Sequence, residues 1–326
     1  MRVVYMGTPD FAVNTLEAVV EAGHEVALVV TQPDKAKGRG KKVICTPVKQ
    51  AALKLNLPVA QPEKVREADF VNRLQTIAPD VIVVVAFGQF LPESILNIPR
   101  LGCINVHASL LPAYRGAAPI QWAVIDGLTE TGVTTMYMEK GIDTGDIICQ
   151  SVIPLVKEET GGSLFDKLAV EGAKLLITTL EQLESGTATR TKQDESKSSY
   201  AKMLSKDMGN LDFSKSAVKL ERLIRGLNPW PSAYTKIDGK TLKIYRAEVL
   251  DALKAEEIAK AGNISAPSFG MVVDIDKKSF TVWCGEGALR IMDLQLEGKK
   301  RMDTSAFLLG NEMHIGMILG NNENIL

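Results

Sequence analysis

Along the first half of the chain, short apolar runs alternate with stretches of helical periodicity. Runs rich in β-branched residues predict strands at 2–6, 25–31, 80–86, 102–107 and 132–138. The run at 80–86 is continuously apolar, as expected of a strand covered on both faces. Helical spacing predicts helices at 11–22 and 46–56, the second with Thr46 as N-cap and Pro47 in its first turn. This alternation predicts an α/β fold with a Rossmann-like, doubly wound and mostly parallel sheet.

The second half of the chain has a different pattern. Apolar positions at helical spacing predict a long amphipathic helix over 163–185. A polar stretch rich in Ser, Thr and Lys follows and predicts a linker at 188–206. One further helix, at 217–228, precedes short strand-like runs separated by turn residues, which are typical of a small, OB-like β-barrel. We therefore expect two domains, at 1–187 and 207–326.

Composition agrees with this organisation and excludes several classes of protein. The chain has 326 residues, of which 45% are hydrophobic and 24% charged, as in ordinary soluble globular proteins. The net charge is −1, so any contact with nucleic acid must come from a local basic patch. The four cysteines form no CxxC pair, which argues against a structural zinc site and predicts reduced thiols in a cytoplasmic protein. No apolar run reaches membrane-spanning length, and no signal peptide is expected.

The candidate chemistry begins at the end of the predicted strand 102–107. Asn105 and His107 are two residues apart, so their side chains point to the same face of the strand. Ligands of open α/β sheets bind at the carboxyl ends of strands, which is where this pair lies. An amide and an imidazole there can stabilise a developing oxyanion. The alternative is a structural role for His107, as we expect for His24 and His314, which have no comparable polar neighbours in the sequence.

A second polar segment, at 139–147, follows the predicted strand 132–138, so we expect it too to lie at a carboxyl end of the sheet. It supplies two carboxylates, Asp143 and Asp146, beside two glycines that permit tight turns. An aspartate beside the imidazole would stabilise its cationic form, and Asn, His and Asp together can support acyl transfer without a Ser or Cys nucleophile. The alternative is an Asx turn that caps the next element. The first strand and its turn lack the G-x-G-x-x-G pattern, which disfavours a dinucleotide site.

These motifs resemble the folate-dependent formyltransferase family. The stretch NVHASLLPAYRGAAPIQW at 105–122, with GIDTGDI at 141–147, is similar to the family's catalytic pattern in both residue type and spacing. Three further stretches, GTPDFA, TQPDKAKGRGKKVICTPVK and NPWPSAY, resemble family members that act on charged tRNA. The resemblance covers the chain up to the tail from residue 313, to which it assigns nothing. One departure is the pair Glu139-Lys140, which keeps an acidic charge ahead of the second motif.

The resemblance implies an enzyme that transfers the formyl group of 10-formyltetrahydrofolate to the α-amino group of initiator methionyl-tRNA. It implies a monomeric cytoplasmic transferase with the formyltransferase fold, without a catalytic metal and without a membrane partner. The family's catalytic residues fall on Asn105, His107 and Asp143. Its folate contacts fall on Ser109, Leu110, Leu111, Pro112, Ala86, Phe87 and Gly88. Its contact to the methionine side chain falls on Phe11, and its tRNA-reading loop falls on 34–45.

The loop at 34–45 is strongly basic. Against the single acid Asp34 it carries Lys35, Lys37, Arg39, Lys41 and Lys42. With Arg39 on base edges and Lys41 and Lys42 on phosphates, such a loop can bind an acceptor stem. Taken alone, the segment is better interpreted as a solvated basic loop, but beside residues that resemble a formyltransferase centre the RNA-binding interpretation is favoured. Further basic residues in the predicted second domain suit backbone contacts to a folded RNA: Lys236, Lys240, Lys243, Arg246, Lys299, Lys300 and Arg301.

Two other functions remain open from the sequence. One is a formyltransferase that acts on a small nucleotide or sugar amine, for which the basic loop has less use. The other is a non-catalytic RNA- or folate-binding protein, against which the intact Asn105, His107 and Asp143 argue.

Overall fold

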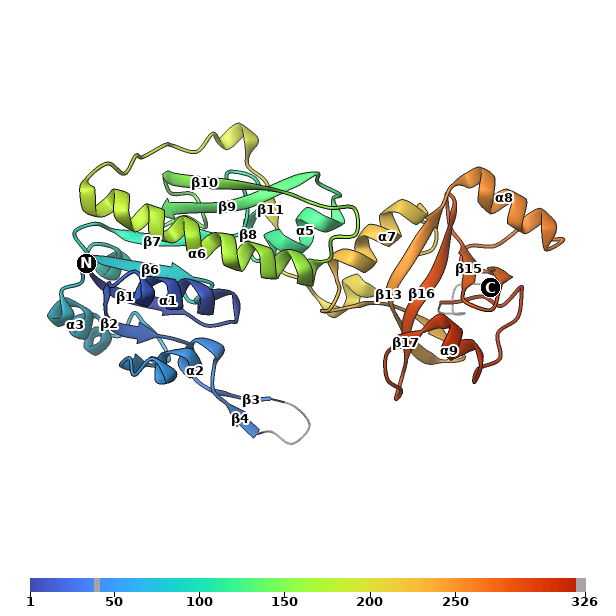
Figure 1. Ribbon diagram of the computed structural model, residues 1–326, viewed down its shortest axis with the longest axis horizontal. Coiled ribbons are helices and arrows are strands. Elements are labelled where there is room, and N and C mark those ends of the chain that lie inside the picture. The colour runs from blue at the N-terminus through green and yellow to red at the C-terminus, as the bar shows by residue number, and fades with distance from the viewer. Residues whose placement is uncertain (38–41, 321–326) are drawn as a thin grey trace. The chain divides into compact units, whose positions relative to one another are not determined.

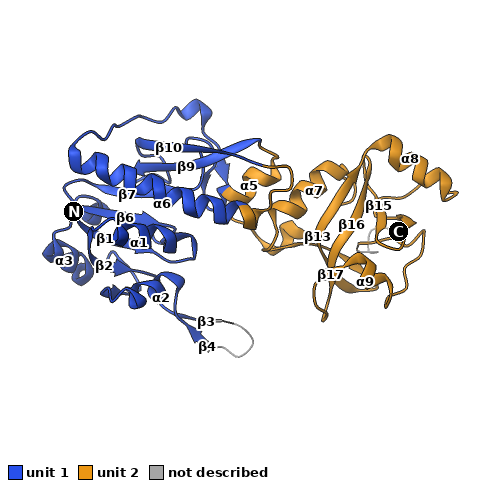
Figure 2. Cartoon of the chain, in the orientation of Figure 1, with its two compact units in different colours: residues 1–119, 129–155, 164–202 blue, residues 120–128, 156–163, 203–326 orange. Residues whose placement is uncertain are grey.

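A computed structural model describes residues 1–37 and 42–320. The described chain divides into two compact units (Figure 2). Unit 1 comprises 1–119, 129–155 and 164–202, and unit 2 comprises 120–128, 156–163 and 203–326. Each unit has its own core.

Unit 1 is built on a seven-stranded sheet in the order β10-β9-β7-β6-β1-β2-β5 (Figure 1). Five neighbouring strands are parallel: β7 (Cys103–His107), β6 (Val81–Val85), β1 (Arg2–Gly7), β2 (Glu25–Val30) and β5 (Val59–Ala60). The chain builds outward from β1 to β5 and then crosses back to β6, so strand order reverses between β1 and β6. The predicted doubly wound, mostly parallel sheet is confirmed.

Alternating side chains bury both faces of this sheet. On one face, Val4 and Met6 of β1 share a core cluster with Leu74 of α3 and Ile95 of α4. On the opposite face, Phe11 of α1 packs edge-on against Phe165 of α6 with ring centroids 5.4 Å apart. The helices of unit 1 are α1 (Phe11–Glu21), α2 (Pro47–Lys54), α3 (Ala68–Ile77), α4 (Glu93–Leu96) and most of α6 (Gly161–Ser185), whereas α5 (Pro119–Ile125) belongs to unit 2 apart from Pro119. At the start of α2, Thr46 accepts the predicted capping hydrogen bond, from the amide of Lys49.

The remaining strands of the sheet, β9 (Glu130–Tyr137) and β10 (Ile147–Pro154), depart from the parallel pattern. Strand β9 runs antiparallel to β7, with His107 opposite Thr134 and Ile104 opposite Tyr137. The chain that follows β9 therefore leaves the sheet at the amino end of β7. This corrects the expectation that the segment 139–147 follows a carboxyl end at the same edge as His107.

The segment 188–206 is more than the linker that its composition predicts. Its residues up to Lys202 belong to unit 1, and Gln193 within it is buried. Strand β11 (Tyr200–Ala201) pairs in parallel with β8 (Arg115–Gly116), and the short turns η1 (Glu195–Lys197) and η2 (Lys206–Gly209) lie on either side of β11 in the sequence. Polar composition here reflects exposed side chains on a segment whose backbone is bonded to unit 1.

Unit 2 contains an antiparallel sheet in the order β12-β13-β16-β15-β14, with β17 (Met302–Asp303) beside β16. Its strands are β12 (Ala233–Ile237), β13 (Lys240–Leu250), β14 (Val272–Ile275), β15 (Phe280–Trp283) and β16 (Ala288–Leu296). The helices α7 (Ala217–Gly226), α8 (Ala252–Ala261) and α9 (Thr304–Leu308) accompany the sheet. A core of aliphatic and aromatic side chains, including Leu220, Phe280 and Phe307, fills its interior.

The C-terminal segment completes this sheet. The amide of Leu319 donates to the carbonyl of Gly270 at 2.8 Å, and the amide of Gly320 donates to the carbonyl of Lys236 at 3.0 Å. Residues 316–320 thus lie between the two edge strands, β14 and β12, and close the sheet toward the predicted barrel. The sequence had assigned no role to this tail.

All four cysteines are free. Within residues 1–37 and 42–320, no helix is long and apolar enough to cross a membrane.

Candidate active site at the carboxyl edge of the sheet

Asn105 and His107 lie at the edge of the sheet where its parallel strands end. Strand β7 is in register with its parallel neighbour β6, so that Asn105 pairs with Val84. The loop 86–89 after β6 therefore lies beside the end of β7, and the loop 8–10 after β1 comes next along the same edge. Because strand order reverses between β1 and β6, this is the edge at which open α/β sheets bind ligands.

Both ring nitrogens of His107 face oxygen atoms. Nε2 lies 2.9 Å from the carbonyl oxygen of Tyr114, which can only accept, so Nε2 carries a hydrogen and donates it. Nδ1 lies 3.6 Å from Oδ2 of Asp143. The ring is only 7% exposed. An imidazolium in this position would donate to the carbonyl and be stabilised by the carboxylate, so the geometry suits a positively charged His107.

Asp143 reaches His107 through its loop. The segment between β9 and β10 folds back toward the end of β7, and Asp143 lies within it in the left-handed backbone conformation, with φ of 53°. The amide of Gly116 donates to Oδ2 of Asp143 at 2.8 Å. The other candidate carboxylate, Asp146, lies 4.0 Å from Arg190. The loop therefore brings Asp143 to the imidazole, and Asn105, His107 and Asp143 together are called the triad below.

Asn105 contributes a buried polar atom without a partner. Its Oδ1 makes no hydrogen bond with any residue that the structure describes. A buried amide oxygen without a partner is costly, so this atom is suited to accept an N–H or O–H from a bound substrate.

The turn after His107 is held by hydrogen bonds to β9 and β10. Thr134 donates to the carbonyl of Ser109 and accepts from the amide of Leu111, at 2.7 and 3.1 Å. Gln150 donates to the carbonyl of Leu111 and to the hydroxyl of Thr134, at 2.9 and 3.0 Å. The side chains of Ser109 and Leu111 are buried, whereas Leu110 and Pro112 are half-buried. The folate contacts expected of this turn stay a prediction. The half-buried Leu110 and Pro112 are better placed to make them than the buried Ser109 and Leu111.

The loop 86–88 offers backbone rather than an aromatic side chain. Phe87 is buried in the core of unit 1, and its carbonyl accepts hydrogen bonds from Thr8 and Gln32. Ala86 and Gly88 are exposed, and both have positive φ. Any folate contact at this loop would therefore be made by Ala86, Gly88 and the main chain. The side chain of Phe87 packs in the core beneath the loop.

The remaining substrate-contact predictions are described only in part. Phe11 is buried against Phe165, and its contact with a methionine side chain stays a prediction. Arg39 and Lys41 lie outside the described residues. Lys42 belongs to β4 (Lys42–Ile44), which pairs with β3 (Lys35–Lys37), but its side chain also lies outside the description.

An ion pair between Asp34 and Lys49 lies at the start of the basic segment 34–45. Nζ of Lys49 lies 2.5 Å from Oδ2 of Asp34 and 2.6 Å from Oε1 of Gln61. Gln61 also donates to Oδ1 of Asp34 at 2.7 Å. The hydrogen bonds from Lys49 and then Gln61 hold the pKa of Asp34 below its usual value, and Asp34 raises the pKa of Lys49.

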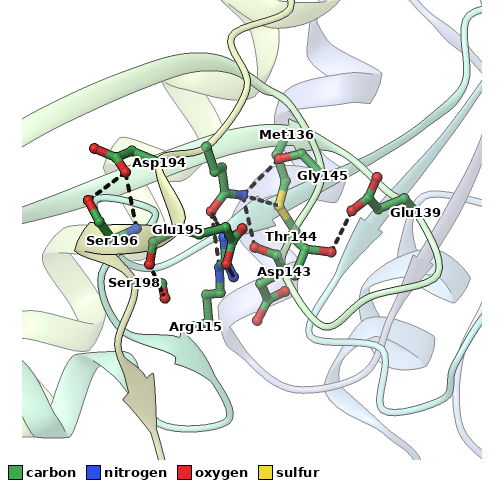
Figure 3. Close-up of polar contacts among 11 residues, drawn as sticks. Arg115, Met136, Glu139, Asp143, Thr144, Gly145, Asp194, Glu195, Ser196 and Ser198 are labelled. Carbon is green, nitrogen blue, oxygen red and sulfur yellow. Dashed lines mark hydrogen bonds and ion pairs between the residues drawn. The ribbon is translucent and has the colours of Figure 1, made fainter.

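Sequence reasoning missed two residues that surround the triad, Arg115 and Gln193. Arg115 is buried to 1% exposure and bonds to Gln193 and Glu195. Figure 3 shows Arg115 and Glu195 side by side. Its hydrogen bond with Glu195 raises the pKa of the guanidinium, which stays charged. An arginine inside the family-like stretch 105–122 was the available signal. Gln193 gave none, because it lies in a segment whose composition is that of a linker.

The triad holds no metal-ligand cluster. Among the residues that the structure describes, no group of three or more His, Cys, Asp or Glu is placed to bind a metal ion. The site instead combines an amide, an imidazole and a carboxylate, which suits transfer of an acyl group.

Comparison with known proteins agrees with this chemistry. Residues 1–180 match the family model described as formyl transferase, and residues 203–312 match that of the formyl transferase C-terminal domain. The chain belongs to the formyl transferase family. It is 58% identical over 323 residues to the methionyl-tRNA formyltransferase of Lachnospira eligens, which covers 98% of this chain and 100% of the relative. It is 46% identical to the enzyme of the same name from Clostridioides difficile, over 98% of this chain and 100% of the relative.

Solved structures share the fold. The sugar 3N-formyl transferase WlaRD superimposes with a TM-score of 0.63 at 18% identity, over 92% of this chain and 99% of that one. HypX from Aquifex aeolicus, in complex with tetrahydrofolic acid, superimposes with a TM-score of 0.60 at 16% identity, over 97% of this chain and 50% of that one.

Proposed function

We propose that this chain transfers the formyl group of 10-formyltetrahydrofolate to the α-amino group of methionine carried by initiator tRNA. The observation that carries the proposal is the approach of Asp143 to His107 beside Asn105, at the edge of the sheet where ligands bind. Relatives named methionyl-tRNA formyltransferase that match almost the whole chain support the choice of substrates.

In this proposal the donor supplies an electrophilic formyl carbon, and the triad handles charge and protons around it. Negative charge develops on the formyl oxygen when the amine attacks. Nδ1 of His107 is 3.6 Å from Asp143, beyond ordinary hydrogen-bonding distance, so its hydrogen can be directed to that oxygen. The amide nitrogen of Asn105 supplies a second donor, and its unpaired Oδ1 accepts a hydrogen from the attacking amine.

Asp143 serves two purposes. Its carboxylate stabilises positive charge on His107 and receives the proton that the amine loses, directly or through a water molecule. The hydrogen bond from the amide of Gly116 fixes the carboxylate for both tasks. The nitrogen of the departing folate takes up the proton at the end of the reaction. The enzyme thus needs no nucleophile of its own.

Recognition is proposed to be divided along the chain. The half-buried Leu110 and Pro112, with Ala86 and Gly88, would contact the folate, and Phe11 would contact the methionine. The basic segment 34–45, with Arg39, Lys41 and Lys42, would bind the acceptor stem of the tRNA. We also propose that the protein acts as a cytoplasmic monomer without a membrane partner, and light scattering of the purified chain tests its monomeric state.

The test compares acceptors with a single labelled donor. Purified protein is incubated with 10-formyltetrahydrofolate labelled in its formyl group and with methionyl initiator tRNA, an elongator methionyl-tRNA or a sugar amine. The proposal expects rapid labelling of the initiator species and slow labelling of the other two. Preferential labelling of the sugar amine would instead assign a small-molecule acceptor, and label in none of them would leave the protein a binding protein.

A further inference from the structure

Arg115 lies in the chain between two residues whose main chains hold the triad. The carbonyl of Tyr114 accepts the hydrogen bond from His107, and the amide of Gly116 donates to Asp143. Between them, the guanidinium of Arg115 is buried, and its Nη1 and Nη2 donate to Glu195 at 2.9 and 2.7 Å. Movement of Arg115 would therefore displace both catalytic contacts at once.

Gln193 connects this arginine to the loop that carries Asp143. Its Oε1 accepts from Nε and Nη2 of Arg115 at 3.1 and 2.8 Å. Its Nε2 donates to the carbonyl of Asp143 at 2.9 Å and to that of Gly145 at 2.7 Å. Figure 3 shows Arg115, Asp143 and Gly145 gathered at this point. The side chain is 5% exposed and uses its full hydrogen-bonding capacity.

We propose that Gln193, anchored by the buried Arg115, is a positioning residue for the loop that carries Asp143. The inference rests on the proposed function, because it concerns the same reaction. Within the part of the chain that the structure describes, Gln193 hydrogen-bonds to the backbone carbonyls of Asp143 and Gly145 and not to His107 or to the carboxylate of Asp143, so it acts through the backbone of the loop. The segment 188–202 thereby belongs to the catalytic unit and sets the distance between Asp143 and His107.

The physical reason lies in the two carbonyl groups that Gln193 satisfies. Asp143 has a left-handed backbone conformation, which the surrounding contacts must maintain. Without Nε2, the carbonyls of Asp143 and Gly145 lose the hydrogen bonds that Gln193 donates, and the loop relaxes toward other partners. A displacement of about 1 Å in a reacting group can slow catalysis by about 100-fold.

The experiment compares two substitutions of Gln193 with a matched control. Gln193→Met keeps the length of the side chain but removes its hydrogen bonds. Gln193→Glu keeps an acceptor for Arg115 but cannot donate to the two carbonyls. The control is Gln182→Met, at a half-buried glutamine of the same unit that accepts a hydrogen bond from Cys149.

Each purified variant is measured for kcat, for KM of both substrates, for the pH profile of kcat and for thermal unfolding. We expect kcat to fall by about 100-fold in both Gln193 variants with little change in either KM. Their pH profiles should be displaced from that of the unaltered chain, because the carboxylate has moved relative to the imidazole. Gln182→Met should keep the original kcat and the original pH profile.

Two results would overturn the positioning role alone. In the first, Gln193→Met matches Gln182→Met in kcat. In the second, its activity falls only in proportion to the unfolded fraction while the pH profile stays unchanged, as for a structural residue. If the unaltered chain itself transfers no formyl group to methionyl-tRNA, the proposed function fails and the positioning role fails with it.

Discussion

The carboxylate of Asp143 lies 3.6 Å from Nδ1 of His107, although the strand that leads to Asp143 runs away from the end of β7. The pairing of β7 with β9 alone would leave the two residues at opposite ends of the sheet. A loop brings them together, and its geometry depends on hydrogen bonds from Gly116 and Gln193. The distance between Asp143 and His107 is therefore a property of loop contacts more than of sheet register.

Replacing Asp143 tests the charge in this pair. Asp143→Asn keeps the size of the side chain and an oxygen that can accept from the amide of Gly116, but it removes the negative charge. We expect kcat to fall by about 100- to 10,000-fold, because both stabilisation of the imidazolium and removal of the amine proton are lost. Steady-state kinetics with methionyl-tRNA measure this, and equilibrium binding of the folate should stay unchanged. Undiminished kcat would remove Asp143 from the mechanism.

Substitution of Asn105 separates its two proposed contributions. Asn105→Ala removes the oxyanion donor and should lower kcat by about 100- to 1000-fold. Asn105→Asp keeps an acceptor for the amine but sets a negative charge beside the developing oxyanion, so it should be slower still. Single-turnover rates at saturating donor compare the two variants. An aspartate variant that is faster than the alanine variant would show that the donor role is misassigned.

The proposed tRNA contact at Arg39 is tested by its effect on one substrate alone. Arg39→Ala should weaken the binding of methionyl-tRNA and leave the binding of folate intact, since the residue is assigned to the acceptor stem. The salt dependence of tRNA affinity should become shallower if the arginine neutralises a phosphate as well. Arg73→Ala, at an exposed arginine of α3, is the matched control. Equal tRNA affinities for the two variants would contradict the assignment.

Much of the fold could be predicted because its signals are local. A continuous apolar run identified β6, a short run rich in β-branched residues identified β7, and the Thr46-Pro47 pair identified the start of α2. The direction of β9 could not be predicted in this way, because a strand has the same pattern of apolar residues whether it runs parallel or antiparallel to its neighbour. Closure of the second sheet by 316–320 was missed for a similar reason, since it depends on main-chain bonds that carry no side-chain pattern.

The candidate site, too, could be predicted only where its residues carry a local sequence signal. Asn105 and His107 could be placed together from strand periodicity, and Asp143 from the family-like motif. Gln193 could not be found, because its role depends on a buried arginine from another segment, and its neighbours in sequence are polar and mostly exposed. Polar composition predicts exposure well, but it does not reveal which single side chain of a segment turns inward.

The ion pair between Asp34 and Lys49 predicts that the stability of the folded protein depends on pH. Because Lys49 and Gln61 lower the pKa of Asp34, the folded state gains stability above the usual aspartate pKa of about 4, and this gain is lost as the pH falls through the lowered value. Lys49→Met should therefore lower the melting temperature at neutral pH. The difference from the unaltered chain should shrink on acidification below about pH 4. Thermal unfolding across this range measures it, and a difference independent of pH would argue against the ion pair.

Gly116 is predicted to tolerate no side chain. Its φ is 107°, and a Cβ there would lie 2.9 Å from the carbonyl oxygen of Ala201. Gly116→Ala should therefore cost about 1–3 kcal/mol of unfolding free energy and reduce kcat, since its amide holds Asp143. Gly23→Ala is a suitable control, because that glycine has a φ of 79° but open space around it. If denaturant titration finds the two variants equally stable, the close approach to Ala201 does not constrain the loop.

The most direct test of the triad is the single-turnover rate of formyl transfer by His107→Ala. The donor is held at saturation and methionyl initiator tRNA is the acceptor, so that binding does not limit the observed rate. Loss of the imidazole that faces Asp143 should slow the transfer by about 100- to 1000-fold while the protein remains folded and binds both substrates. A rate close to that of the unaltered chain would contradict the assignment of the chemistry to this edge of the sheet.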